Sequence, residues 1–201
     1  MHVIIDYGMG NLASVQRAFE KLDVDVKISN KIEDLRTAKS LILPGVGAFR
    51  DAIKALNDSG LSDVIKEEVS QGKKIIGICL GMQLLYEKGF EYGDYHGLGL
   101  IKGDIKYLDV NLKIPHMGWN NLKFVKEDPI LKYINEDEYV YFVHSYYAVS
   151  DSTELIAYSQ YGNKVPSIVR NKNVYGIQFH PEKSGETGLN ILKAYKEIME
   201  S

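Results

Sequence analysis

The chain has 201 residues, a net charge of −3 at neutral pH, 45% hydrophobic and 25% charged residues, as is usual for a globular protein of one domain. Its basic residues do not cluster, which excludes an electrostatic nucleic-acid-binding face, and no apolar run is long enough to cross a membrane. One cysteine permits no internal disulfide, and one cysteine with scattered histidines gives no metal-ligand spacing. We therefore expect a single cytoplasmic domain over residues 1–201, without a metal or cofactor.

The first half of the chain alternates strand and helix patterns. Short apolar or alternating runs predict strands at residues 3–5, 24–28, 41–43 and 75–78. Segments of helical periodicity predict helices at 12–22 (capped by Asn11), 32–38, 48–57, 61–70 and 80–87. The alternation predicts a largely parallel sheet with helices on both faces.

The second half is richer in strands. Short β-type runs separated by turns fill residues 97–124 and 139–178, with a hairpin turn expected at 171–173. An amphipathic helix over 187–199 closes the chain. The predicted fold is α/β, with a mixed, largely parallel central sheet flanked by helices.

A Gly-Ile-Cys-Leu-Gly motif at residues 77–81 has the features of a nucleophile elbow. It joins a predicted strand to a predicted helix and places Cys79 between two glycines. We expect this turn to be strained and to expose the Cys79 sulfur, where the positive end of the following helix stabilises a thiolate. The alternative is a buried cysteine that only fills the core.

A histidine and an acid follow a second predicted strand, at His180 and Glu182. In an extended segment alternate side chains share one face, so Glu182 is positioned to orient the His180 ring and stabilise its imidazolium form. Cys79, His180 and the Pro-Gly-Val-Gly loop at 44–47 all follow strands directly. In open α/β sheets this edge carries the ligand crevice.

Further residues near the elbow are candidates for substrate contact. Free N–H groups of the 44–47 loop and of Leu80 are candidates for an oxyanion hole. Gln83, one helical turn beyond Cys79, would either bind a polar group of the substrate or face solvent. The segment 6–11 is too short for a phosphate-binding fingerprint and predicts a tight turn.

The motifs at 77–83 and 179–182 resemble the class I, triad-type glutamine amidotransferases. Further motifs at 6–12, 43–49, 97–101 and 115–120 are similar to those of the glutaminase subunits of imidazole glycerol phosphate synthases. The resemblance covers nearly the whole chain and implies a flavodoxin-like fold with Cys79, His180 and Glu182 as the catalytic triad. It also implies that the oxyanion and glutamine-binding residues are Val46, Gly47, Leu80, Gln83, Glu91, His144, Ser145 and Tyr146.

The resemblance also implies a heterodimer with a (β/α)₈ synthase subunit. The synthase would use the ammonia, passed inside the complex, to make imidazole glycerol phosphate and an aminoimidazole carboxamide nucleotide in histidine biosynthesis. Glutaminase activity would depend on this partner, with Trp119, Tyr141 and Lys183 at the interface near the ammonia entry.

Three alternatives stay open. Residues 88–96 depart from the run usual in the family, although Glu91 still aligns with a glutamine-binding acid. This departure leaves room for a closely related glutaminase that feeds a sugar amidotransferase in surface-polysaccharide biosynthesis. The other two are an elbow-cysteine hydrolase acting on peptides or glyoxals and a non-catalytic interaction subunit.

Overall fold

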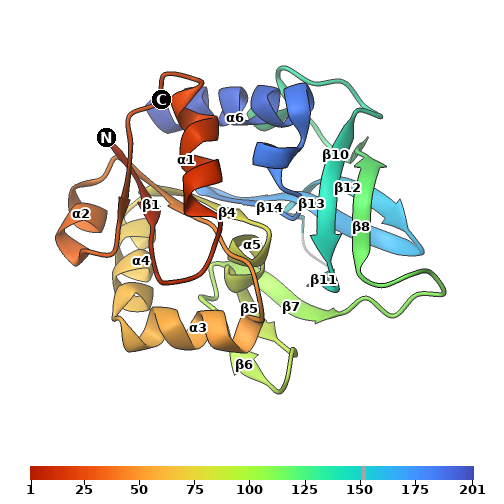
Figure 1. Ribbon diagram of the computed structural model, residues 1–201, viewed down its shortest axis with the longest axis horizontal. Helices are drawn as coiled ribbons and strands as arrows, with labels where there is room; N and C mark the ends of the chain where they lie inside the picture. Colours follow the sequence, from red (N-terminus) through yellow and green to blue (C-terminus); the bar gives the residue numbers. More distant parts are fainter. Residues whose placement is uncertain (151–152) are drawn as a thin grey trace.

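An eight-stranded mixed sheet forms the centre of the computed structural model, which describes residues 1–150 and 153–201 (Figure 1). Its strands are β1 (His2–Ile5), β2 (Val26–Ser29), β3 (Ser40–Leu43), β4 (Lys74–Ile78), β9 (Lys123–Phe124), β12 (Leu155–Tyr161), β13 (Asn163–Asn171) and β14 (Val174–Ile177). The order across the sheet is β2-β1-β3-β4-β14-β13-β12-β9. The pairs from β2 to β14 are parallel and the rest are antiparallel. The carboxyl ends of β3, β4 and β14 therefore lie at one edge of the sheet.

Helices cover both faces of this sheet. They are α1 (Leu12–Glu20), α2 (Ile32–Thr37), α3 (Phe49–Asp58), α4 (Leu61–Ser70), α5 (Leu80–Leu84) and α6 (Gly185–Glu200), with 3-10 turns η1 (Pro129–Leu131) and η2 (Pro181–Lys183). α1 and α6 share one hydrophobic cluster, in which Phe19 and Tyr195 are fully buried, while α3, α4 and α5 pack into a second cluster. In the ribbon, α1 and α6 lie together, away from α3 and α4 (Figure 1). No helix within the described residues is long and apolar enough to cross a membrane.

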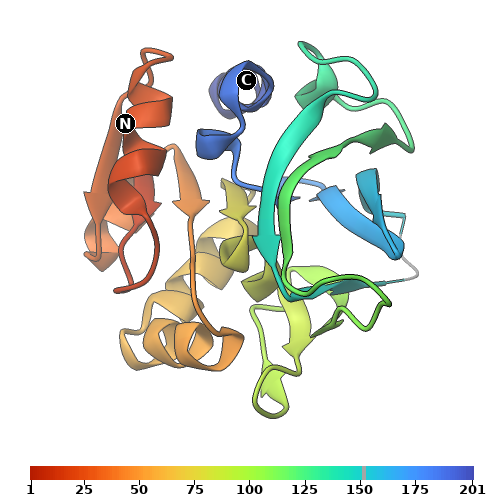
Figure 2. The ribbon, with the colours of Figure 1, turned by 45° about the vertical axis from the view of Figure 1, so that its right-hand side comes forward.

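Two smaller sheets complete the second half of the chain. The first has the order β11-β7-β5-β6 and is made of β5 (Tyr86–Gly89), β6 (Tyr95–His96), β7 (Ile101–Tyr107) and β11 (Tyr146–Val149). The second is an antiparallel ribbon of β8 (His116–Asn121) and β10 (Tyr139–His144), which is long and curved in Figure 2. The turn between β10 and β11, at residue 145, joins the two small sheets.

The predicted α/β class, the parallel first half and the closing helix are confirmed. The helix predicted at 80–87 is wrong in length, because it ends at Leu84 and residues 86–89 instead pair with β7 and β6. Asn11 does occupy the position before α1, but its side chain makes no capping hydrogen bond. The strands of the second half also divide among three sheets, which the sequence pattern did not indicate.

Candidate active site

The turn after β4 holds Cys79 in a strained backbone conformation at the carboxyl edge of the sheet. Its φ is +55°, a region that non-glycine residues rarely adopt. Its amide N donates to the Ile177 carbonyl oxygen at 2.7 Å, which ties the elbow to β14. Glycine is needed on both sides, because a Cβ at Gly77 would lie 2.6 Å from the Gly81 backbone and one at Gly81 would overlap the Leu43 carbonyl oxygen. The two glycines therefore let α5 pack directly on β3 and β4.

The Cys79 side chain is not open to bulk solvent as the elbow motif predicts, since only 7% of it is exposed. It instead lines a cavity of about 330 Å³ at the edge of the sheet. The end of β10 and the turn after it line the same cavity, and Cys79 Sγ lies 3.9 Å from the Val143 carbonyl oxygen. The thiol therefore faces a cavity rather than bulk solvent.

His180 and Glu182 are joined by a hydrogen bond of 2.8 Å between His180 Nδ1 and Glu182 Oε1. Both side chains are almost completely buried. The expected extended segment is wrong, because Pro181 begins the 3-10 turn η2, and this turn rather than strand alternation brings the carboxylate under the ring. Glu182 is therefore fixed on the side of the imidazole away from Cys79.

The electrostatics of the site favour a protonated His180. Burial acts to lower the pKa of His180, but the interactions with Cys79 and with the hydrogen-bonded carboxylate of Glu182 outweigh it and raise that pKa to about 10. The other ring nitrogen, Nε2, is buried and has no hydrogen-bond partner of good geometry within the described residues. This nitrogen is free to exchange a proton with the thiol or with a bound substrate.

The loop after β3 forms another wall of the cavity. Gly47 has a φ of +100°, and a Cβ there would lie 2.9 Å from the Met9 methyl carbon. Tyr7 donates its hydroxyl to the Pro44 carbonyl oxygen at 2.8 Å and so anchors the start of the loop. Sequence reasoning missed Tyr7, whose contact with residue 44 is long-range.

The residues predicted to bind the oxyanion and glutamine lie together. All of them line the cavity that holds Cys79 and His180, and they are Val46, Gly47, Leu80, Gln83, Glu91, His144, Ser145 and Tyr146. Pro115 and Val143 line it too and were not predicted. Their roles in binding stay predictions.

Two of these side chains, Glu91 and Gln83, already form hydrogen bonds within the protein. Glu91 Oε2 accepts a 2.8 Å hydrogen bond from the Phe49 amide N at the start of α3, and burial raises the pKa of Glu91. Gln83 is buried rather than solvent-facing, and its Nε2 donates to Tyr146 O at 2.9 Å and Gln178 Oε1 at 3.1 Å. Both hydrogens of the Gln83 amide nitrogen are therefore used in hydrogen bonds within the protein and are not free to bind a substrate.

The three predicted interface residues lie on the outer surface next to the triad. Trp119 is 56% exposed, so it is not a core residue, and its ring contacts that of Tyr141 edge-on, with centroids 6.0 Å apart. Lys183 is exposed and follows Glu182 directly. Met117 and Tyr139, on the same two strands, extend the exposed apolar surface.

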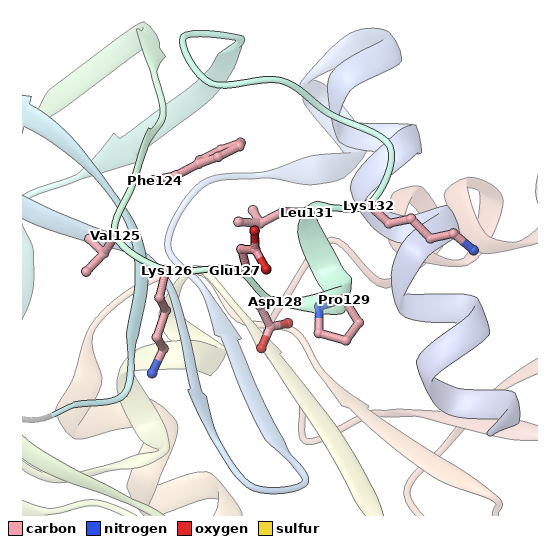
Figure 3. Close-up of a pocket in the computed structure, with 8 residues that line it drawn as sticks. All are labelled: Phe124, Val125, Lys126, Glu127, Asp128, Pro129, Leu131 and Lys132. Carbon is pink, nitrogen blue, oxygen red and sulfur yellow. The ribbon is translucent and has the colours of Figure 1, made fainter.

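A larger cavity of about 650 Å³ lies away from Cys79, along residues 124–132 (Figure 3). Its central carboxylate is structural, since Asp128 accepts from the Ile130 amide N at 3.0 Å and pairs with Arg170 at 2.9 Å. Lys126 donates to the Thr153 carbonyl oxygen. Size alone therefore does not mark the functional site, and the smaller cavity at Cys79 carries the reactive groups.

A thiol and an imidazole that line one cavity, with a carboxylate bonded to the imidazole, define the class of thiol-dependent acyl-transfer enzymes. Residues 3–195 match the family model described as "Glutamine amidotransferase class-I". The chain belongs to the class I glutamine amidotransferase family.

Individual curated relatives point to a narrower group within this family. The chain is 51% identical over 201 residues to the imidazole glycerol phosphate synthase subunit HisH of Oceanobacillus iheyensis, covering 99% of this chain and all of that protein. It is 52% identical over 196 residues to the subunit of the same name from Lactococcus lactis, covering 97% of each chain. A solved glutamine amidotransferase matches over the full length of both chains with a TM-score of 0.80 at 19% identity, which supports the fold.

Proposed function

We propose that this protein is the glutaminase subunit of an imidazole glycerol phosphate synthase, acting as one cytoplasmic domain. It hydrolyses glutamine to glutamate and ammonia and passes the ammonia to a (β/α)₈ synthase partner. The observation that carries the proposal is the Cys79–His180–Glu182 set at one cavity, in a chain about half identical to subunits of that name over nearly their whole length. The sugar-amidating alternative is not favoured, because these relatives carry the biosynthetic name.

The reaction begins with the thiolate of Cys79 and the imidazolium of His180. The thiolate attacks the carboxamide carbon of glutamine, and the N–H groups of Leu80 and of the 46–47 loop stabilise the oxyanion that forms. His180 Nε2 gives its proton to the amide nitrogen as the carbon–nitrogen bond breaks. Ammonia leaves, and a glutamyl thioester stays on Cys79.

Water completes the cycle. Neutral His180 takes a proton from a water molecule as the water oxygen attacks the thioester carbon. The tetrahedral species expels the Cys79 thiolate, glutamate departs, and the imidazolium of His180 is restored. Glu182 holds the ring in one orientation through both steps and stabilises its positive charge.

The synthase partner docks, in this proposal, on the exposed face of the β8–β10 ribbon. Exposed aromatic side chains are favoured interface anchors, and Trp119 and Tyr139 lie there together with Met117. Lys183 adds a positive charge one residue from the triad. Docking at this surface would place the acceptor of ammonia beside the site that releases it.

The test is reconstitution with the (β/α)₈ synthase of the same organism. The complex should form glutamate and use glutamine nitrogen for its product. Cys79→Ala should abolish glutamine-dependent synthesis but retain synthesis from added ammonium salts, because only the glutaminase step is lost. Glutamate formation by Cys79→Ala would contradict the proposal. Co-purification from the host with a sugar-modifying enzyme instead would favour the alternative.

A further inference from the structure

A continuous chain of buried and partly buried hydrogen bonds runs from β8 to the sulfur of Cys79. We infer that its side chains are positioning residues that hold the nucleophile and the turn over it in one arrangement. We call this chain the buried relay, and its members are Asn120, His116, His144, Gln83 and Gln178. The inference rests on the proposed function only where glutamine turnover is measured.

The outer end of the relay is fixed by backbone groups around Asn120. Its Oδ1 accepts from the Asn121 amide N at 2.9 Å, and its Nδ2 donates to the Gln160 carbonyl oxygen at 3.1 Å. The same Nδ2 lies 3.2 Å from His116 Nε2. An amide nitrogen only donates, so Nε2 of His116 must accept and its proton must lie on Nδ1.

The second histidine is fixed independently from its other side. His144 Nδ1 lies 2.8 Å from the Tyr146 carbonyl oxygen, which only accepts, so this nitrogen carries a proton. His144 Nε2 is then the acceptor for His116 Nδ1–H at 2.9 Å. His116 and His144 therefore each carry a single ring proton, on Nδ1, and both rings are neutral. Burial agrees, since it lowers the pKa of His116 to about 4 and that of His144 to about 3.

The Tyr146 carbonyl joins the histidines to the nucleophile. It also accepts from Gln83 Nε2 at 2.9 Å, which fixes the orientation of that amide. Gln83 Nε2 gives its second hydrogen to Gln178 Oε1 at 3.1 Å, so Gln178 Nε2 must face Cys79 Sγ, at 4.0 Å. Gln178 is completely buried, and its N–H dipole stabilises negative charge on the sulfur.

The position of β8 controls the outer end of the relay. The His116 ring is stacked between Phe142 and Tyr161, at 4.5 and 4.0 Å between ring centroids. Successive residues of a strand point to opposite faces, so Met117 and Trp119 are exposed while His116 is buried beneath them. Because His116 and Asn120 both lie on β8, the position of this strand sets the geometry at the outer end of the relay.

The tautomers can be read in the unmodified full chain. ¹⁵N NMR of protein labelled at histidine, at pH 6.5, should show His116 and His144 as neutral Nδ1–H imidazoles. An Nε2–H tautomer or an imidazolium at either residue would overturn the relay. This measurement needs neither the synthase nor turnover.

Variants test the functional consequence of the relay. His116→Phe keeps the ring stacking but removes both ring nitrogens. Gln178→Leu removes the N–H group that faces the sulfur. If the leucine variant does not fold, Gln178→Glu replaces it, because glutamate is closer to glutamine in shape. The matched control is His2→Phe, another buried histidine, which bonds Ser40 at 2.8 Å outside the relay. The readouts are alkylation of Cys79 by iodoacetamide and kcat and KM for glutamine with the synthase.

Gln178→Leu should slow alkylation about fivefold or more, and His116→Phe should lower kcat/KM about tenfold, because each substitution removes two hydrogen bonds of the relay. The control should stay within about twofold. Relay variants that match the control in both assays would overturn the inference. If the wild type fails to hydrolyse glutamine, the proposed function fails, but alkylation and the tautomers still decide the relay.

Discussion

Glu182→Gln tests how much of the activity depends on the charge that faces His180. The two side chains share a 2.8 Å hydrogen bond and are only 2% and 4% exposed, so solvent screens the interaction little. A hydrogen bond to a charged group contributes about 1.5–3 kcal/mol. Losing about 2 kcal/mol from the imidazolium-dependent step corresponds to a roughly 30-fold lower kcat. Glutamine preserves the size of the side chain, so packing is unchanged.

The same variant has a predicted pH dependence. The carboxylate helps to raise the pKa of His180 to about 10, so its loss moves that pKa down. The alkaline limb of the kcat profile should therefore shift to lower pH in the variant. The assay is glutamate formation by the synthase complex between pH 6 and 10. Glu68→Gln is the control, because Glu68 is also buried, in an ion pair with Lys73, but does not line the cavity. A kcat within about twofold of wild type and an unshifted profile would refute the reasoning.

Three further predictions concern stability and docking. Gly81→Ala should lower the free energy of unfolding by about 1–3 kcal/mol, because its Cβ would overlap the Leu43 carbonyl oxygen, and an unchanged Tm would contradict this. His116 and His144 stay neutral in the folded state to about pH 4 and 3, whereas the unfolded chain protonates them below about 6.5. The unfolding free energy should thus fall as pH drops from 6.5 towards 4, and urea denaturation of His116→Phe should show a weaker dependence. Trp119→Ala should weaken synthase binding about tenfold or more in calorimetry without changing the Tm of the isolated chain, since the ring is exposed.

The parallel half of the fold was predictable because each strand is a local apolar run buried by helices on both faces. The strands at 3–5, 41–43 and 75–78 all lie in the central sheet as predicted. The early end of α5 was not predictable, because residues 86–89 combine a helix-compatible pattern with pairing to strands that follow later in the chain. Tertiary pairing overrode local propensity there.

The active site was likewise only partly predictable from the sequence. The elbow and the His-Pro-Glu tripeptide are local motifs, so Cys79 and Glu182 could be found from sequence. Gln178 and His116 act through contacts 99 and 28 residues apart in the chain, which no local pattern encodes. One signal was available for Gln178, since it precedes His180 by two positions at the end of a strand, a spacing that favours one face.

The most direct test of the central claim, that Cys79 is the nucleophile toward glutamine, is mass spectrometry of the synthase complex after reaction with 6-diazo-5-oxo-L-norleucine. This electrophilic glutamine analogue should add once per chain, on the peptide that contains Cys79, and excess glutamine should protect the site. An adduct on another residue, or none in a complex that forms glutamate, would contradict the account.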